Sequence, residues 1–195
     1  MATHPDGVLG FEDEVWWSRV RQPSVSAWTP TDRPLRLVEQ SVAKDDPDPK
    51  ALAWYGLLLR DASATPDQMW LRFVDGRPVS ALTIQFLDWC CARLAALDKT
   101  ALLLVWDNAA WHLSMAVRTW LRAHNRQVKA QGAGVRILPC FLPTKSPWLN
   151  PIEPKWTHGK RTVLDPDRLL AAQELESRVC DYYACDHGPR LAITE

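Results

Sequence analysis

The pattern of apolar and polar positions along the chain predicts five strands and four helices. Strands are predicted where apolar residues alternate with polar ones or form short continuous runs, at residues 8–11, 52–60, 69–74, 101–106 and 135–138. Helices are predicted where apolar residues recur at helical spacing, after the cap residues Ser80, Ser114 and Asn150 and again over residues 168–183. Pro151 fits the first position of the third helix, which should end near Arg161.

The order of these elements predicts the topology of a sheet. A short turn separates the second and third strands, which favours a hairpin and an antiparallel arrangement of the first three strands. Residues 101–106 form a continuous apolar run, which is typical of a strand that is buried on both faces and parallel to its neighbours. Helices on either side of this strand are crossover connections, and these join parallel strands. The sequence therefore predicts an α/β fold with a mixed five-stranded sheet, three antiparallel strands followed by two parallel ones, and helices on both faces.

Length and composition indicate one globular domain. The chain has 195 residues, of which 47% are hydrophobic and 24% charged, and this excludes a disordered or collagen-like chain. Within a single domain of residues 1–195, the stretch 21–49 is expected to be a loop and residues 165–195 a helical tail. No apolar run is long enough for a membrane span, and the N-terminus lacks the pattern of a signal peptide. The protein is therefore expected in the cytoplasm, without a membrane partner.

The cysteines do not predict a disulfide framework. There are five of them, an odd number, and none forms a CxxC pair, so reduced thiols are expected. Cys180, Cys185 and His187 are close in sequence, but no fourth ligand follows at the spacing of a zinc finger. A metal site is not expected at these residues.

The formal net charge of +0 hides an uneven distribution. Residues 113–161 hold nine basic side chains and one acidic one, Glu153. Such a surface suits the phosphate backbone of DNA, because Lys and Arg replace condensed counterions there. A solvated helix face can carry the same charges, so the pattern alone leaves both interpretations open. The basic residues are Arg118, Arg122, Arg126, Lys129, Arg136, Lys145, Lys155, Lys160 and Arg161.

Three acidic residues are predicted at the ends of elements. Asp13 follows the first strand, Asp107 follows the fourth, and Glu153 lies in the first turn of the third helix. Strand periodicity places Asp13 on the face of Leu9 and Phe11. Asp107 also suits a turn, and Glu153 also suits a capping box after an asparagine cap, so neither position alone indicates catalysis.

The sequence words around these acids resemble motifs of the mariner-like DDE transposase superfamily, particularly its bacterial insertion-sequence branch. WDNAAWH at 106–112 resembles the motif of the second acid, and LPTKSPWLNPIEPKW at 142–156 resembles the motif of the third. FEDE at 11–14 looks like the weaker first motif. The resemblance implies an RNase H-like fold with adjacent first and fourth strands. It assigns Asp13, Asp107 and Glu153 as catalytic metal ligands, with Glu14 as the reserve for the first position and Glu12 also open.

The chemistry implied by this family is divalent-metal-dependent cleavage at transposon ends, followed by strand transfer into target DNA. Two Mg²⁺ or Mn²⁺ ions on the three carboxylates would serve an in-line phosphodiester displacement. The resemblance also implies a bacterial protein that acts at the nucleoid, and a homodimer. No helix-turn-helix module is recognisable in the chain, so a separately encoded helix-turn-helix protein is the expected source of end recognition.

Further residues near these motifs are candidates for DNA contact or for support of the acids. Basic side chains around the third acid are assigned to phosphates: Lys145, Lys155, Lys160 and Arg161. His112 is assigned to a phosphate or to local hydrogen bonding, and Trp148 and Trp111 to base stacking. Asn108 and Asn150 are expected to support the carboxylate ligands without binding the metal ions themselves. Two alternatives remain open: a catalytically idle transposase remnant that binds DNA or dimerises, and another RNase H-like nuclease such as a resolvase or ribonuclease.

Overall fold

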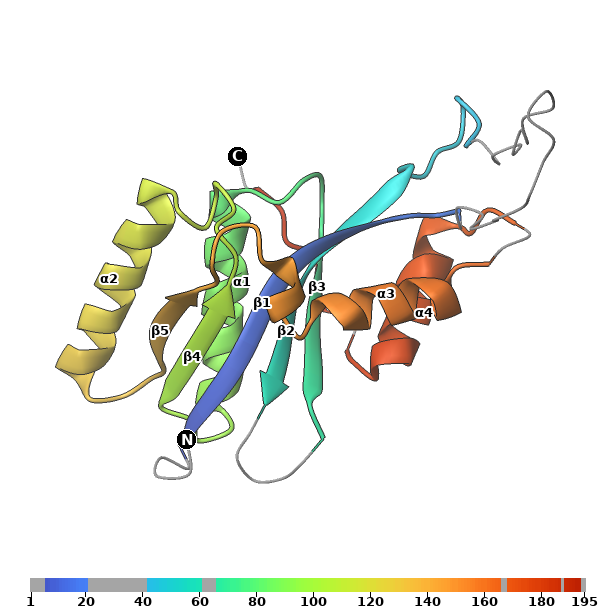
Figure 1. The fold of residues 1–195 in the computed structure, drawn as a ribbon. Coiled ribbons are helices and arrows are strands. Elements are labelled where there is room, and N and C mark those ends of the chain that lie inside the picture. The colour runs from blue at the N-terminus through green and yellow to red at the C-terminus, as the bar shows by residue number, and fades with distance from the viewer. Residues whose placement is uncertain (1–5, 21–41, 61–65, 166–167, 187, 194–195) are drawn as a thin grey trace.

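A five-stranded sheet with the strand order β3-β2-β1-β4-β5 forms the centre of the protein (Figure 1). The computed structural model describes residues 6–20, 42–60, 66–165, 168–186 and 188–193. The strands are β1 (Gly7–Ser18), β2 (Ala51–Arg60), β3 (Gln68–Val74), β4 (Ala101–Trp106) and β5 (Arg136–Phe141). Pairs β1/β2 and β2/β3 are antiparallel, whereas β1/β4 and β4/β5 are parallel. The predicted mixed sheet and the adjacency of the first and fourth strands are confirmed.

Helices cover the sheet on both faces (Figure 1). The crossover helices α1 (Ser80–Ala95) and α2 (Met115–Gln131) pack on one face, and α3 (Glu153–Val163) and α4 (Ala172–Tyr183) pack on the other. The strand period of two divides the apolar side chains between two cores. On β2, for example, Tyr55 and Leu57 belong to the core under α1 and α2, while Trp54 and Leu58 belong to the core under α3 and α4. None of the helices among the described residues is long and apolar enough to cross a membrane.

Strand β4 is buried on one face rather than on both, so that expectation was wrong. Leu102, Leu104 and Trp106 are fully buried against the core under α1 and α2. Leu103 points to the other face and is 37% exposed. The buried residues of the core under α3 and α4 that come from the sheet lie on β1, β2 and β3, and from β4 only the partly buried Val105 packs against this core.

Strand β1 is longer than predicted, and Glu12, Asp13 and Glu14 lie inside it. Its pairing with β2 continues to Ser18, whereas its pairing with β4 ends where Phe11 meets Val105. Pairing with β2 therefore holds the acidic triplet in regular strand geometry. On its other edge, β1 no longer pairs with β4 at these residues. This position gives the triplet both rigidity and access to the end of β4.

Helix starts differ from the predicted ones by a few residues. Ser114 caps α2 as predicted, and its side chain accepts a hydrogen bond from the Val117 amide at 3.3 Å. Ser80 is instead the first residue of α1, and its hydroxyl donates to the carbonyl of Trp111 at 3.4 Å. Helix α3 begins at Glu153 rather than at the predicted Pro151, and α4 begins after residue 171 rather than at 168.

Candidate active site

Asp13, Asp107 and Glu153 line one cavity of about 310 Å³. Asp13 comes from β1, Asp107 follows β4, and Glu153 begins α3. The loop after β5 completes the wall with residues 142–147, and Asn150 lies beside Glu153. Of the acidic triplet in β1, Asp13 lines this cavity with the other two acids, which favours it over Glu12 and Glu14 as the first ligand.

Asp13 is fixed from the α3 side of the sheet. It pairs with Gly56 of β2, and the side chain of Trp156 packs directly over that glycine. The indole Nε1 of Trp156 donates to Asp13 Oδ2 at 2.8 Å. Burial, followed by the negative charges of Glu153 and Glu12, raises the pKa of Asp13 to about 8. Without a cation, this carboxyl group resists ionisation.

Asp107 is oriented by the turn that follows β4. Its Oδ1 accepts hydrogen bonds from the Ala109 amide at 2.8 Å and from His112 Nδ1 at 2.8 Å. The bond from His112 lowers the pKa of Asp107, so this side chain is held as a carboxylate. Among the described residues, Oδ2 has no hydrogen-bond partner, and the side chain is 50% exposed. One oxygen is thus anchored and the other is available to a ligand.

Glu153 is positioned by the turn around Asn150. Asn150 is 2% exposed, and its Nδ2 donates to the carbonyl of Glu12 at 3.0 Å. Asn150, which was predicted to cap α3, therefore ties the start of this helix to β1. The residue at the N-cap position of α3 is Ile152, and its side chain forms no capping hydrogen bond. Burial, followed by the charge of Asp107, raises the pKa of Glu153. Asp107 thus raises the pKa of Glu153, and Glu153 in turn raises that of Asp13.

Glu12 and Glu14 point to the opposite face of β1 and meet His112, which the sequence analysis did not predict. His112 is fully buried, with Nε2 3.0 Å from Glu14 Oε1 and 3.2 Å from Glu12 Oε2. Burial disfavours the charged imidazole, but the charge of Glu12 and the bonds to the surrounding carboxylates outweigh it and raise the pKa of His112. Burial and the charge of Glu14 raise the pKa of Glu12 to about 7. The bond to Asp107 is of the kind that the local hydrogen-bonding alternative for His112 describes, and a phosphate contact by His112 would require these bonds to break.

Of the other predicted residues, Lys145 and Asn108 line the cavity, and the rest do not. Lys145 lines it, and Trp148 of the short helix η1 (Pro147–Leu149) is 73% exposed. Asn108 also lines it and donates from Nδ2 to the carbonyl of Leu142 at 2.7 Å, which ties the end of β4 to the loop after β5. Trp111 is partly buried and donates to Glu14 Oε1 at 2.7 Å. On α3, Lys155 and Arg161 are exposed and Lys160 is half-buried.

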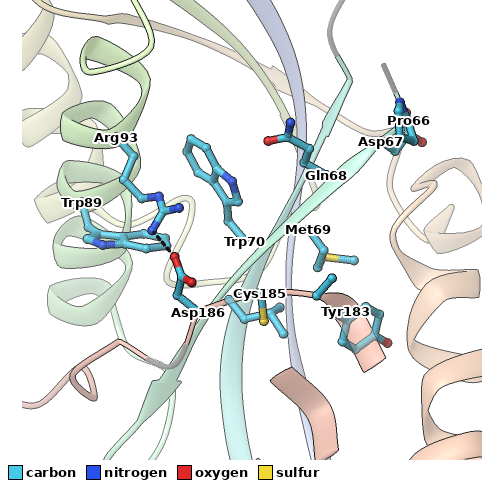
Figure 2. Close-up of a pocket in the computed structure, with 12 residues that line it drawn as sticks. Pro66, Asp67, Gln68, Met69, Trp70, Trp89, Arg93, Tyr183, Cys185 and Asp186 are labelled. Atoms are coloured by element: carbon cyan, nitrogen blue, oxygen red, sulfur yellow. Dashed lines mark ion pairs between the residues drawn. The ribbon is translucent and has the colours of Figure 1, made fainter. Parts of the chain in front are cut away.

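A second cavity, of about 410 Å³, lies beside the edge strand β3 and lacks free carboxylates (Figure 2). Arg93 lies over the rings of Trp70 at 4.9 Å and Trp89 at 5.1 Å, and it pairs with Asp186 at 3.6 Å. The other acid of this cavity, Asp67, pairs with an arginine of β2. The cavity is therefore no candidate for a metal centre.

Of the three residues considered for a zinc site, Cys185 lines the second cavity and Cys180 is buried. His187 lies outside the described residues.

The sheet order, together with acids from β1, from the end of β4 and from the helix after β5, defines an RNase H-like fold with an acidic site. The chain belongs to the DDE superfamily endonuclease family, whose model matches residues 62–176. The assignment of the DDE superfamily from the sequence words is thereby confirmed.

Solved structures of Mos1 transposase share this fold. A Mos1 paired-end complex with the left transposon end has a TM-score of 0.59 at 17% identity and covers 92% of this chain. The Mos1 mariner paired-end complex with Mn has a TM-score of 0.58 at 19% identity and also covers 92% of this chain. This chain spans 48% of the matched Mos1 chain in both complexes, and 70% in a structure of the Mos1 catalytic domain. No curated protein sequence matches the chain.

Proposed function

We propose that this chain is the catalytic domain of a DNA transposase, which cleaves phosphodiester bonds at transposon ends and joins the freed 3′ hydroxyl to target DNA. The observation that carries the proposal is the convergence of Asp13, Asp107 and Glu153 on one cavity. The family membership and the fold shared with Mos1 transposase support it. An idle remnant has no need to keep three acids in one cavity.

The three acids fit divalent cations. Hard cations such as Mg²⁺ and Mn²⁺ take carboxylate oxygens as ligands, and three carboxylates in one cavity are unfavourable without such a charge. Burial, and then the neighbouring carboxylate charges, raise the pKa of Asp13 and of Glu153, and a bound cation would offset both effects. We propose that Asp13, Asp107 and Glu153 hold two ions. The Mos1 complexes with Mn and with Mg are consistent with this assignment.

Each protein group has a separate task in the proposed reaction. When bound, the metal ions would activate the attacking oxygen and stabilise the leaving one. Trp156 holds Asp13, and the Ala109 amide holds Asp107, so the ligands are positioned before substrate arrives. Lys145 lies at the cavity and is suited to the phosphate of the scissile strand. Trp148, at 73% exposure, is suited to stacking on an unpaired base.

Cleavage of duplex DNA that carries candidate transposon ends tests the proposed function. We expect strand cuts that leave a 3′ hydroxyl in the presence of Mg²⁺ or Mn²⁺, and none in EDTA. Cleavage that persists in EDTA would contradict the proposal. A preference for RNA–DNA hybrids or branched DNA over linear duplex would instead assign the site to another RNase H-like nuclease.

A basic surface runs along α2, and we propose that it contacts DNA phosphates. Arg118, Arg122, Arg126 and Lys129 are exposed on one side of this helix, which has no acidic residue in its sequence. None of the four forms an ion pair with another described residue, whereas Arg60, Arg168, Arg178 and Arg190 all do. Unpaired cations are free to replace the counterions of a duplex.

Replacing these four α2 residues by glutamine should weaken DNA binding and flatten its salt dependence. Each phosphate contact contributes about 0.9 to the slope of log K against log salt, so loss of four contacts lowers the slope by up to about 3.6. Fluorescence anisotropy with a duplex at several salt concentrations measures it. The control is the same change at the four paired arginines, which should leave the slope almost unaltered. Equal slopes for the two variants would refute the α2 contact.

A further inference from the structure

Behind the candidate metal centre lies a second group of ligand-type side chains, Glu12, Glu14 and His112. Their possible ligand atoms all lie within 4.8 Å of one another, an arrangement that could hold a cation. Strand geometry places Glu12 and Glu14 on the opposite face of β1 from Asp13, so this group is separate from the cavity of the three acids. Its role follows from the contacts of His112.

Both ring nitrogens of His112 already have partners. Nδ1 lies 2.8 Å from Asp107 Oδ1, and Nε2 lies 3.0 Å from Glu14 Oε1. Histidine binds a metal through a nitrogen with a free lone pair, and neither nitrogen is free here. The side chains of His112 and Glu12 are also completely buried. The group is therefore suited to positioning rather than to metal binding.

The ring of His112 is held tightly in place. It stacks on Trp106 with a centroid distance of 4.6 Å and an interplanar angle of 20°. Its acceptor Glu14 is itself held by the indole of Trp111, which donates to the same oxygen at 2.7 Å. The backbone of Trp111 in turn accepts from Ser80 at the start of α1. His112 cannot turn without breaking several contacts.

We propose that His112, supported by Glu14, is a positioning residue that fixes Asp107 for metal binding. The inference rests on the proposed function, because it assumes that Asp107 is a ligand. The Ala109 amide alone gives the half-exposed Asp107 side chain one anchor, and the bond from His112 Nδ1 to the same Oδ1 adds a second that fixes the rotamer in which Oδ2 is available. Glu14 is next to Asp13 in β1, so the same strand sets the positions of both ligands.

Two amide substitutions at His112 separate positioning from packing. The side-chain amide of His112→Asn comes close to the place of Nδ1 and can still donate to Asp107, whereas the longer side chain of His112→Gln places its amide near Nε2. We expect His112→Gln to weaken Mn²⁺ binding by about 10- to 100-fold, and His112→Asn to retain most of the affinity. Isothermal calorimetry and the EPR signal of free Mn²⁺ measure the affinity, and thermal unfolding in EDTA checks that both variants are folded.

Further variants keep the outcomes distinct. Glu12→Gln should leave the number of Mn²⁺ ions unchanged, and loss of a bound ion would show that the buried group is a metal site. If His112→Gln does not fold, Trp111→Phe gives the same test, since it removes the donor to Glu14 and should lower the affinity by about tenfold. Equal affinities for the Asn and Gln variants at position 112 would overturn the inference. If Asp107→Asn also leaves Mn²⁺ binding intact, the metal assignment itself fails.

Discussion

Replacing Asp107 by asparagine should lower metal-dependent DNA cleavage by about a thousandfold or more. An amide keeps the size of the side chain and can still accept from the Ala109 amide, but it removes one negative charge from the metal site. Stabilisation of a phosphodiester transition state by metal ions amounts to several kcal/mol, and about 4 kcal/mol corresponds to a thousandfold change in rate. Single-turnover cleavage of an end-bearing duplex at saturating Mn²⁺ measures the loss.

The matched control is Asp98→Asn. Asp98 is exposed, lies outside the cavity of the three acids, and has a φ of 55°, a conformation that asparagine tolerates. This variant should cleave at the rate of the unaltered protein. If Asp107→Asn keeps a comparable rate while folded, Asp107 is not a metal ligand and the proposed reaction is wrong.

The relative directions of the strands could be predicted, because they follow from the elements that connect consecutive strands in the sequence. Helices between the last strands require parallel neighbours, and the hairpin requires an antiparallel pair. The length of β1 could not be read in the same way, since the polar triplet at its centre looks like the end of a strand. Pairing with β2 along the whole of β1 decides its length, and this pairing is a tertiary contact.

The sequence could nominate candidate ligands where a single acid stands in a distinctive motif. Asp107 and Glu153 follow from such motifs, and the cavity contains both. The contact between His112 and Glu14 was not predictable, because the two are far apart in sequence and His112, in the turn after β4, meets the neighbouring strand β1 only in the folded chain. A signal did exist in the alternation of β1, which separates Glu12 and Glu14 from Asp13. That alternation indicates which acids share a face of β1, but not which residues they contact.

Asn150 makes contacts beyond those of a helix cap. Its Oδ1 accepts from the Ile152 amide at 3.5 Å, and its Nδ2 donates to the carbonyl of Glu12 in β1. That bond joins the loop that leads to Glu153 to the strand that carries Asp13. The network of His112 and Glu14 does the same for Asp107 on the other face. Strand β1 is therefore the common support of all three acids.

Replacing Gly56 by alanine should destabilise the fold and also weaken metal binding. A Cβ at this position overlaps the Cη2 and Cζ2 atoms of Trp156 and comes within 3.2 Å of Ile152. The indole must move away from the sheet, and its hydrogen bond to Asp13 Oδ2 is then lost. Overpacking of this kind costs about 1–3 kcal/mol, which lowers the melting temperature by about 2–12 °C in a chain of this size. Thermal unfolding in EDTA and Mn²⁺ calorimetry measure the two effects.

Gly76→Ala and a double variant separate these effects. Gly76 has a φ of 91° and open space around it, so alanine there should reduce stability through backbone strain without changing Mn²⁺ affinity. In Gly56→Ala combined with Trp156→Phe, the smaller ring makes room for the methyl group but cannot donate to Asp13. Stability should then recover in part while Mn²⁺ affinity stays low. Recovery of both together would mean that the indole fills space over Gly56 and that its hydrogen bond does not position Asp13.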